Sequence, residues 1–238
     1  MNVKNTLLLA LCFGLTFLAA GCKKMGPEPA AAAPEFGWQI DQFADLRILR
    51  YQVPGFEALT PSQKELVYDL SEAALCGRDI IFDQNYKHNI KILRTLDAIV
   101  EGYKGDRNNP RWTEFMTFVK RVWFSNGIHH HYSTDKILPG FDADYFAALV
   151  KGSEGVTFPL GEGQSVDDLV AFLRPILFDP AVAPKKVSQD STKDLVVNSA
   201  VNFYEGVTQA EVEAYTKGIV DVKDTWSRPS SGEGDPGT

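Results

Sequence analysis

The residues best suited to chemistry are three consecutive histidines, His129, His130 and His131, out of the four histidines in the chain. Histidines at positions i and i+4 of a helix, with a glutamate between them, form a familiar hydrolytic zinc site. Consecutive side chains on a strand or loop point in different directions, so three adjacent rings rarely converge on one ion. We therefore expect a polar loop that forms hydrogen bonds and faces a cleft, and no metal ligands within this chain.

Other catalytic signatures are absent from the sequence. Neither a Gly-x-Ser-x-Gly nucleophile elbow nor a Walker phosphate loop occurs. Gly161-Glu162-Gly163 lacks the preceding strand that a phosphate loop requires. The carboxylate pairs Asp167 with Asp168 and Glu211 with Glu213 are expected at the first turns of helices, where the macrodipole favours negative charge. The sequence therefore predicts no catalytic residue.

Capping residues and apolar spacing predict the helices that must position these residues. Thr60, Pro61 and Gln63 form a capping box, and apolar residues then recur at three-and-four spacing as far as Ile81, before a break at 83–85. Cys76 lies in this helix, and we expect it to be a small core residue. Further helices are expected at 90–102, from Pro110 to a stop at Asn126-Gly127, at 142–152, from Ser165 to before Pro175, and from Thr208 onward.

One segment has the composition of a strand. Residues 195–204 are β-branched and aromatic and partly alternate, which predicts a strand. We therefore expect an α+β fold that is dominated by helices, with a few strands toward the C-terminal half. Residues 60–125, held together by local helix packing, should be the most stable part.

Composition and charge narrow the possible partners. Of the 238 residues, 44% are hydrophobic, which is normal for a globular protein, and the formal net charge is -7. No block of basic residues interrupts this negative charge. We therefore expect no nucleic acid among the partners of this chain.

The first residues resemble a bacterial lipoprotein signal. Lys4 gives a positive start, residues 6–18 are apolar but too short to span a bilayer, and residues 18–22 resemble a lipobox. The leucine of this lipobox stands four residues before the cysteine instead of the usual three, and an ordinary secretory signal is the alternative. We expect removal of residues 1–21, lipidation of Cys22, and a chain anchored to a bacterial membrane, on its periplasmic side.

Segments with little to bury flank the expected fold. Residues 22–36 are rich in proline and alanine after the cysteine, which is typical of a semi-extended tether. Residues 224–238 contain mostly glycine, serine, proline and charged residues, which predicts a disordered tail. The folded part is therefore expected to comprise residues 37–223.

Three segments of this folded part resemble the N-terminal part of bacterial dipeptidyl peptidase III. They are residues 42–56, residues 63–80, and residues 123–136, the last of which reads Trp-Phe-Ser-Asn-Gly-Ile-His-His-His-Tyr-Ser-Thr-Asp-Lys. The resemblance extends over about residues 38–222. That family consists of zinc exopeptidases that remove dipeptides from the free N-terminus of oligopeptides, in a wide cleft between two lobes.

The resemblance implies an incomplete enzyme. The zinc helix of the family carries His-Glu-x-x-Gly-His, with a further glutamate ligand downstream, and neither has a counterpart in this sequence. The resemblance therefore implies that zinc belongs to a metal lobe outside this chain. The chain itself would be most of the N-terminal half of the non-metal lobe, with a small β-barrel-like sheet that later sequence completes. A truncated or frame-shifted reading frame would account for the tail at 224–238.

The resemblance also points to substrate-binding residues. In the family, the loop that matches residues 126–136 approaches the cleft and touches the bound peptide, which makes Asn126, His131 and Tyr132 candidates for binding without bond-breaking chemistry. The alternative is that Tyr132 packs beneath the loop and His131 is solvated. Asn126 and Gly127 would then set the turn, since both residue types tolerate positive φ.

Two functions from different classes remain open. The first is a fragment of a zinc aminodipeptidase, inactive alone, whose intact form uses a metal-activated water and a glutamate base from the zinc helix on an oligopeptide. The second is a membrane-anchored lipoprotein that binds peptides or another protein and performs no chemistry.

Overall fold

The structure is a computed structural model that describes residues 36–224. The chain is α+β and helix-rich, as the sequence predicts. The signal segment, Cys22 and the tether before Phe36 lie outside the described residues, as does the tail after Asp224. The elements in chain order are β1 (Gln39–Phe43), β2 (Leu46–Leu49), the 3-10 helix η1 (Phe56–Ala58), α2 (Pro61–Cys76), α3 (Arg78–Asn85), α4 (Asn89–Gly102), α5 (Pro110–Ser125), α6 (Ala143–Lys151), α7 (Val166–Phe178) and α8 (Gln209–Asp224).

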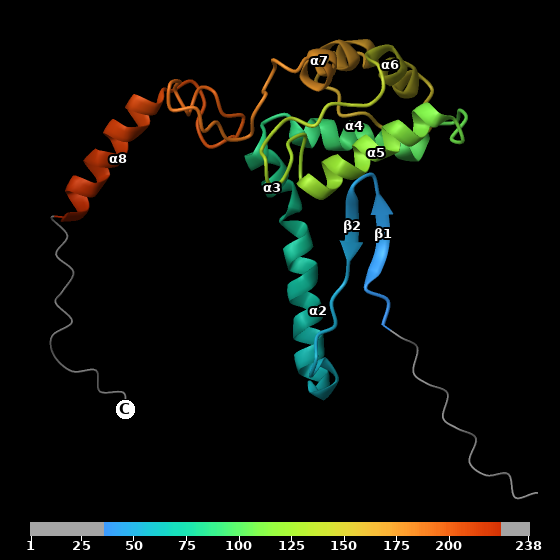
Figure 1. The fold of residues 1–238 in the computed structure, drawn as a ribbon, viewed down its shortest axis with the longest axis horizontal. Helices are drawn as coiled ribbons and strands as arrows, with labels where there is room; N and C mark the ends of the chain where they lie inside the picture. The colour runs from blue at the N-terminus through green and yellow to red at the C-terminus, as the bar shows by residue number, and fades with distance from the viewer. Residues whose placement is uncertain (1–35, 225–238) are drawn as a thin grey trace, which may run out of the picture.

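The hydrophobic core lies among α4, α5, α6 and α7 (Figure 1). We call these four helices, together with α3 and the loops between them, the body. Each helix presents one apolar face inward, because its apolar residues recur at helical spacing. Phe82 of α3 completes this core. The largest side chains that are fully buried are Phe82, Phe115, Phe118, Phe146, Ile92, Leu96, Ile99, Ile128, Leu149, Leu169, Leu173 and Leu177.

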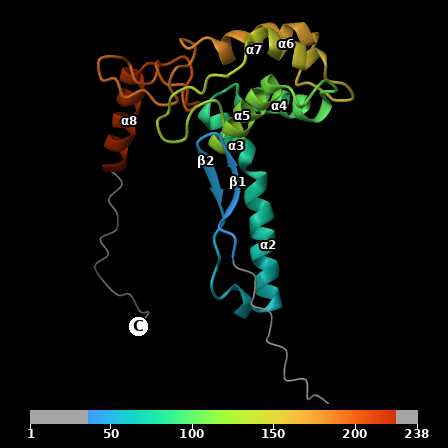
Figure 2. The ribbon, with the colours of Figure 1, turned by 45° about the vertical axis from the view of Figure 1, so that its right-hand side comes forward.

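A second unit, which we call the arm (residues 39–76), projects from this body. It consists of the β1–β2 hairpin, η1 and α2, and the two views show it extending away from the helical layers (Figures 1 and 2). The hairpin is antiparallel, with Phe43 opposite Leu46 and an irregular register between Gln39 and Asp41. Its attachment is mainly electrostatic, since Asp41 pairs with Lys120 of α5 at 3.0 Å and Asp45 pairs with Arg121.

The helix predicted to run unbroken to Ile81 is divided in two. It begins as expected, because Thr60 and Gln63 form the predicted capping box. It ends at Cys76, where Gly77 separates α2 from α3, and α3 continues to Asn85 through the predicted break. Glycine has a low helix propensity, which makes it a favourable place for such a division.

The prediction that Cys76 is a core residue is wrong, because its side chain is exposed. The whole of α2 has no buried residue. Residues 60–125 therefore do not form one packed block, and the packed part begins at Phe82 in α3.

The strand predicted at 195–204 is also wrong. Here the carboxylate of Asp194 accepts hydrogen bonds from the backbone N–H groups of Val196 and Val197, both at 2.9 Å. The Ser199 hydroxyl donates to the carbonyl of Leu195 at 2.6 Å. These side chains satisfy backbone groups that a strand would offer to a neighbour, so the segment folds into turns. The strands of the described part lie in its N-terminal portion, opposite to the expectation.

The remaining helices begin where their capping residues predicted. Asn109, Asp142 and Ser165 each accept a hydrogen bond from a backbone N–H in the first turn of α5, α6 and α7. The α7 helix does not stop before Pro175 but includes it in its last turn. Asp168 and Glu211 close reciprocal caps with Ser165 and Thr208, as expected for carboxylates at helix starts, and α8 stands apart from the body (Figures 1 and 2). Over residues 36–224, none of the helices has both the length and the apolar character that a membrane crossing requires.

Candidate functional site

The loop at residues 126–137, which follows α5, contains all the predicted substrate-binding residues. Asn126 ends α5 in the left-handed conformation (φ 52°), and Gly127 follows with φ 140°. The Gly127 N–H donates to the carbonyl of Val122 at 3.0 Å, which closes the helix end. The two residues therefore set the turn as the sequence predicted.

A buried asparagine holds the start of this loop. Asn89, fully buried at the beginning of α4, donates through Nδ2 to the carbonyl of Phe82 at 3.0 Å. Its Oδ1 accepts a hydrogen bond from the N–H of Ile128 at 3.2 Å. Asn85 adds a bond from its Nδ2 to the carbonyl of Asn126 at 2.9 Å. The backbone carbonyl of Asn126 is thus occupied within the protein.

His129 is a buried structural group. Its side chain is 1% exposed, and its Nε2 lies 2.8 Å from the carbonyl oxygen of Ala183. A carbonyl only accepts hydrogen bonds, so Nε2 carries the proton and Nδ1 is bare, with no partner among the described residues. Burial lowers the pKa of His129 to about 4, and the nearby cations Lys136 and Lys186 favour the same direction. The ring is therefore neutral at physiological pH.

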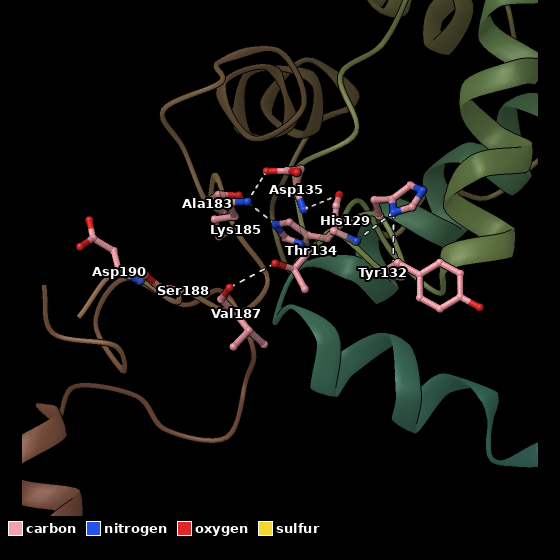
Figure 3. A network of polar contacts seen from close by, with 11 residues as sticks. His129, Tyr132, Thr134, Asp135, Ala183, Lys185, Val187, Ser188 and Asp190 are labelled. Atoms are coloured by element: carbon pink, nitrogen blue, oxygen red, sulfur yellow. Dashed lines mark hydrogen bonds and ion pairs between the residues drawn. The ribbon is translucent and has the colours of Figure 1, made fainter. Parts of the chain in front are cut away.

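The far side of the loop is joined to residues 182–188 (Figure 3). The N–H of Lys186 donates to the carbonyl of Thr134 at 2.8 Å, and the Thr134 hydroxyl donates to the carbonyl of Val187 at 3.1 Å. Asp135 forms an ion pair with Lys185. Lys136 reaches the carbonyl oxygens of Asp179 and Val182 through its ammonium group, at 2.6 and 2.9 Å. These bonds fix the position of the loop on the body.

Three rings at the tip of the loop, His130, His131 and Tyr132, form what we call the ring stack. The centroids of His130 and His131 lie 4.4 Å apart, and those of His131 and Tyr132 are also 4.4 Å apart. Phe124 of α5 meets His131 edge-on at 4.9 Å. The Nδ1 atom of His130 accepts hydrogen bonds from the N–H groups of Tyr132 and Ser133, at 3.2 and 3.1 Å, which fixes the first ring.

The alternative packing of Tyr132 and His131 is wrong. Tyr132 does not pack beneath the loop, because it is 85% exposed. His131 is not fully solvated either, since it is half-buried between its neighbours and burial lowers its pKa. The tip therefore presents aromatic faces to the solvent on a base that is held by hydrogen bonds to α5 and to residues 182–188.

The three imidazoles of the loop do not share a direction. His129 is directed inward to Ala183, His130 accepts from the backbone, and His131 lies between Phe124 and Tyr132. Over residues 36–224, no group of three or more histidine, cysteine, aspartate or glutamate side chains is arranged to hold a metal ion. The residues present do not fit a zinc ion in this loop.

The partner segment of the loop could not be predicted from the sequence. Residues 182–188 carry no recognisable motif, and Ala183 takes a left-handed conformation (φ 48°) that alanine rarely adopts. Thr134 is also left-handed, with φ 61°. Neither residue type signals positive φ, so no local pattern could have predicted how residues 126–137 meet residues 182–188.

The chain matches no protein-family model. No curated protein matches it at a significant level.

Proposed function

We propose that this chain is the N-terminal, substrate-binding part of a zinc-dependent exopeptidase of the dipeptidyl peptidase III type, which releases dipeptides from the N-termini of oligopeptides. It would be exported and held at the membrane by a lipid on Cys22. The single observation that carries the proposal is the ring stack, because the loop with the most distinctive resemblance presents His131 and Tyr132 on a fixed base.

The chemistry available to this tip suits peptide binding. Tyr132 offers an exposed aromatic face and a phenolic hydroxyl that can donate or accept a hydrogen bond. His130 retains Nε2 as a donor, because its Nδ1 accepts from the backbone. A peptide in an extended conformation has carbonyl and N–H groups free for such contacts. The rings would position a substrate and would not break its bonds.

The exposed apolar side chains of the arm favour the proposal that this chain is part of a larger lobe. Large apolar side chains of α2 and the hairpin are exposed, among them Leu66, Leu70, Trp38 and Ile40, each at 57% or more. Large apolar side chains exposed in this number are typical of a face that another protein surface covers. In the proposed enzyme, the remaining sequence of the non-metal lobe would supply that cover.

In the proposed enzyme, the metal would come from polypeptide outside this chain, as the family resemblance implies. When bound in the intact enzyme, zinc would activate a water molecule and polarise the peptide carbonyl. The part left to this chain is to bind and orient the peptide.

The same exposed apolar surface favours a second candidate function, a membrane-anchored lipoprotein that binds a peptide or protein without chemistry. The two candidates differ in what the gene encodes. Sequencing and translating the DNA after codon 238 in all frames should reveal a His-Glu-x-x-Gly-His motif within a few hundred codons if the chain belongs to a peptidase. The absence of this motif would leave the second candidate.

An activity assay tests the assignment of roles directly. The purified chain should not hydrolyse a dipeptidyl-naphthylamide, with or without zinc. The longer product that includes the motif should hydrolyse it, and Tyr132→Ala in that product should raise KM by about tenfold with little change in kcat, because binding and not chemistry is lost. Zinc-dependent turnover by the 238-residue chain alone would contradict the proposed division of roles.

A further inference from the structure

A pocket of about 660 Å³ lies behind the loop, between the end of α3 and the turns at 195–208. Its walls include Tyr86 and Lys87 on one side, and Ala183 and Pro184 with residues 196–202 and 204–208 on the other. This volume is within the range of small-molecule sites, about 300–1,000 Å³. The ring stack does not line it, so the pocket is separate from the site proposed for peptide binding.

Backbone hydrogen bonds form this pocket without a ligand. The N–H of Asn202 donates to the carbonyl of Gln84 at 2.8 Å, and the N–H of Ala200 donates to the carbonyl of Lys185 at 3.0 Å. On the same side, the bond from His129 to Ala183 fixes the backbone next to Pro184. A wall held in this way loses little freedom when a ligand binds, which favours affinity.

Two charges of opposite sign stand side by side at the pocket. The Nζ atom of Lys87 lies 2.5 Å from Oε1 of Glu205, and both residues line the pocket. Both side chains are substantially exposed to solvent, so their pair is weak and a ligand can exchange with it.

Tyr86 adds a phenolic hydroxyl to the residues of the pocket. The residue is 7% exposed and lines the pocket. Burial raises the pKa of Tyr86, which keeps the hydroxyl protonated and able to donate. The apolar residues of the remaining wall include Val196, Val201 and Val207.

We propose that this pocket binds a free α-amino acid with an apolar side chain. Such a molecule carries its ammonium and carboxylate groups on one carbon, and the adjacent Lys87 and Glu205 match this arrangement in charge. The ligand carboxylate pairs with Lys87 and its ammonium with Glu205, so each charge of the ligand meets a charge of opposite sign. A simple anion would be repelled by the carboxylate of Glu205 beside Lys87 and is disfavoured. The apolar side chain packs against the valines, and the Tyr86 hydroxyl donates to the carboxylate.

Calorimetric titration of the full chain in detergent with L-leucine tests this proposal, which is independent of the proposed peptidase function. We expect a dissociation constant of about 1 mM or lower, with N-acetyl-L-leucine and L-leucinamide each binding about tenfold more weakly, because each lacks one charge. These analogues test the proposal on the unaltered protein. Absence of leucine binding up to about 10 mM, or equal binding of the three compounds, would overturn it.

Variants then assign the binding to this pocket. Lys87→Met and Glu205→Gln should each weaken leucine binding by about tenfold, and Tyr86→Phe by about threefold. The matched control is Lys151→Met, which removes another exposed ion pair, to Asp167 at 2.9 Å, away from the pocket. Tyr132→Ala should also leave leucine binding unchanged. Binding that is lost with Tyr132→Ala but kept with Lys87→Met would place the ligand at the ring stack and refute the proposal.

Discussion

Phe115 at the centre of the body has no exposed surface, whereas Leu70 on the arm is 60% exposed. Both residues belong to helices with apolar residues at helical spacing, and each helix begins with a side-chain cap followed by a proline. The α5 helix packs its apolar face into the core, while α2 leaves its face in solvent. Amphipathic spacing therefore shows that a face is suited to burial but does not identify what covers it.

The two units also differ in how they are held. The body is stabilised by burial of aromatic and branched side chains, which contributes about 1.5–3 kcal/mol for each. The arm is attached mainly through α3 and through the ion pairs of Asp41 and Asp45 with α5. Exposed ion pairs contribute only about 0–1 kcal/mol each. We therefore expect the body to unfold as one unit and the arm to open locally at much lower cost.

The largest contrast should come from shortening one apolar side chain in each unit. Phe115→Ala should lower the free energy of unfolding by about 3–5 kcal/mol, because it leaves a cavity in the core. Leu70→Ala should change it by less than about 0.5 kcal/mol, because the side chain is already in solvent. Urea denaturation followed by circular dichroism measures both. A large loss with Leu70→Ala would show that the α2 face is covered in solution, which would break the comparison.

Acid should weaken the body through His129. Its folded-state pKa of about 4 lies below the ordinary value of 6.5, so between these two pH values the unfolded chain binds the proton more readily. The contribution of His129 to the free energy of unfolding should therefore fall as the pH falls from 6.5 to 4, by at most about 3 kcal/mol, and change no further below 4. Denaturation midpoints measured across this range provide the test.

The matched control for this pH dependence is His129→Gln, which can still donate a hydrogen bond to the carbonyl of Ala183. In this variant, the slope between pH 6.5 and 4 should be reduced, because the titrating group is gone. An unchanged slope would assign the acid sensitivity to other residues. The arm has no histidine, so hydrogen exchange in α2 should not follow this transition.

A glycine in each unit provides a third contrast. Gly127 in the body and Gly55 in the arm both have positive φ, at 140° and 90°. A Cβ at Gly127 would overlap the side chain of Asn89, whereas a Cβ at Gly55 would meet open space. Gly127→Ala should lower the stability of the body by about 2 kcal/mol or more, since strain and overlap add. Gly55→Ala should cost only the local strain of about 1 kcal/mol, within the arm. Thermal unfolding measures the global effect of each substitution, and hydrogen exchange measures the local effect within the arm. Equal losses of global stability for the two variants would argue against an overlap between the new Cβ and Asn89.

Much of the helical layout was predictable because capping is local. Asn109, Asp142 and Ser165 each satisfy an N–H group within three residues, so a short window of sequence contains the signal. The turn at Asn126-Gly127 was predictable for the same reason. The β1–β2 hairpin was missed, because its turn at Ala44-Asp45 places an alanine at φ 48° where asparagine or glycine would be expected.

The errors arose where distant contacts or side chains override local preference. The valines at 196–197 favour a strand, but Asp194 captures their N–H groups. The role of His129 depends on Ala183, 54 residues later in the chain, and no spacing rule joins them. In the candidate site, the path of the loop determines the exposure of Tyr132 and its contact with His131. Residue type alone therefore could not predict either feature.

The smallest effect concerns two equivalent helix caps. Thr60 and Ser165 both accept a hydrogen bond from the backbone N–H three residues later, in capping boxes that begin α2 and α7. Ser165→Ala should lower the global free energy of unfolding by about 1 kcal/mol, because α7 belongs to the core. Thr60→Ala removes a similar bond from a helix with no buried residue, so it should speed hydrogen exchange within α2 by about fivefold and leave the global value unchanged. Equal global losses for the two variants would show that α2 unfolds with the body, and that the arm is part of one cooperative unit.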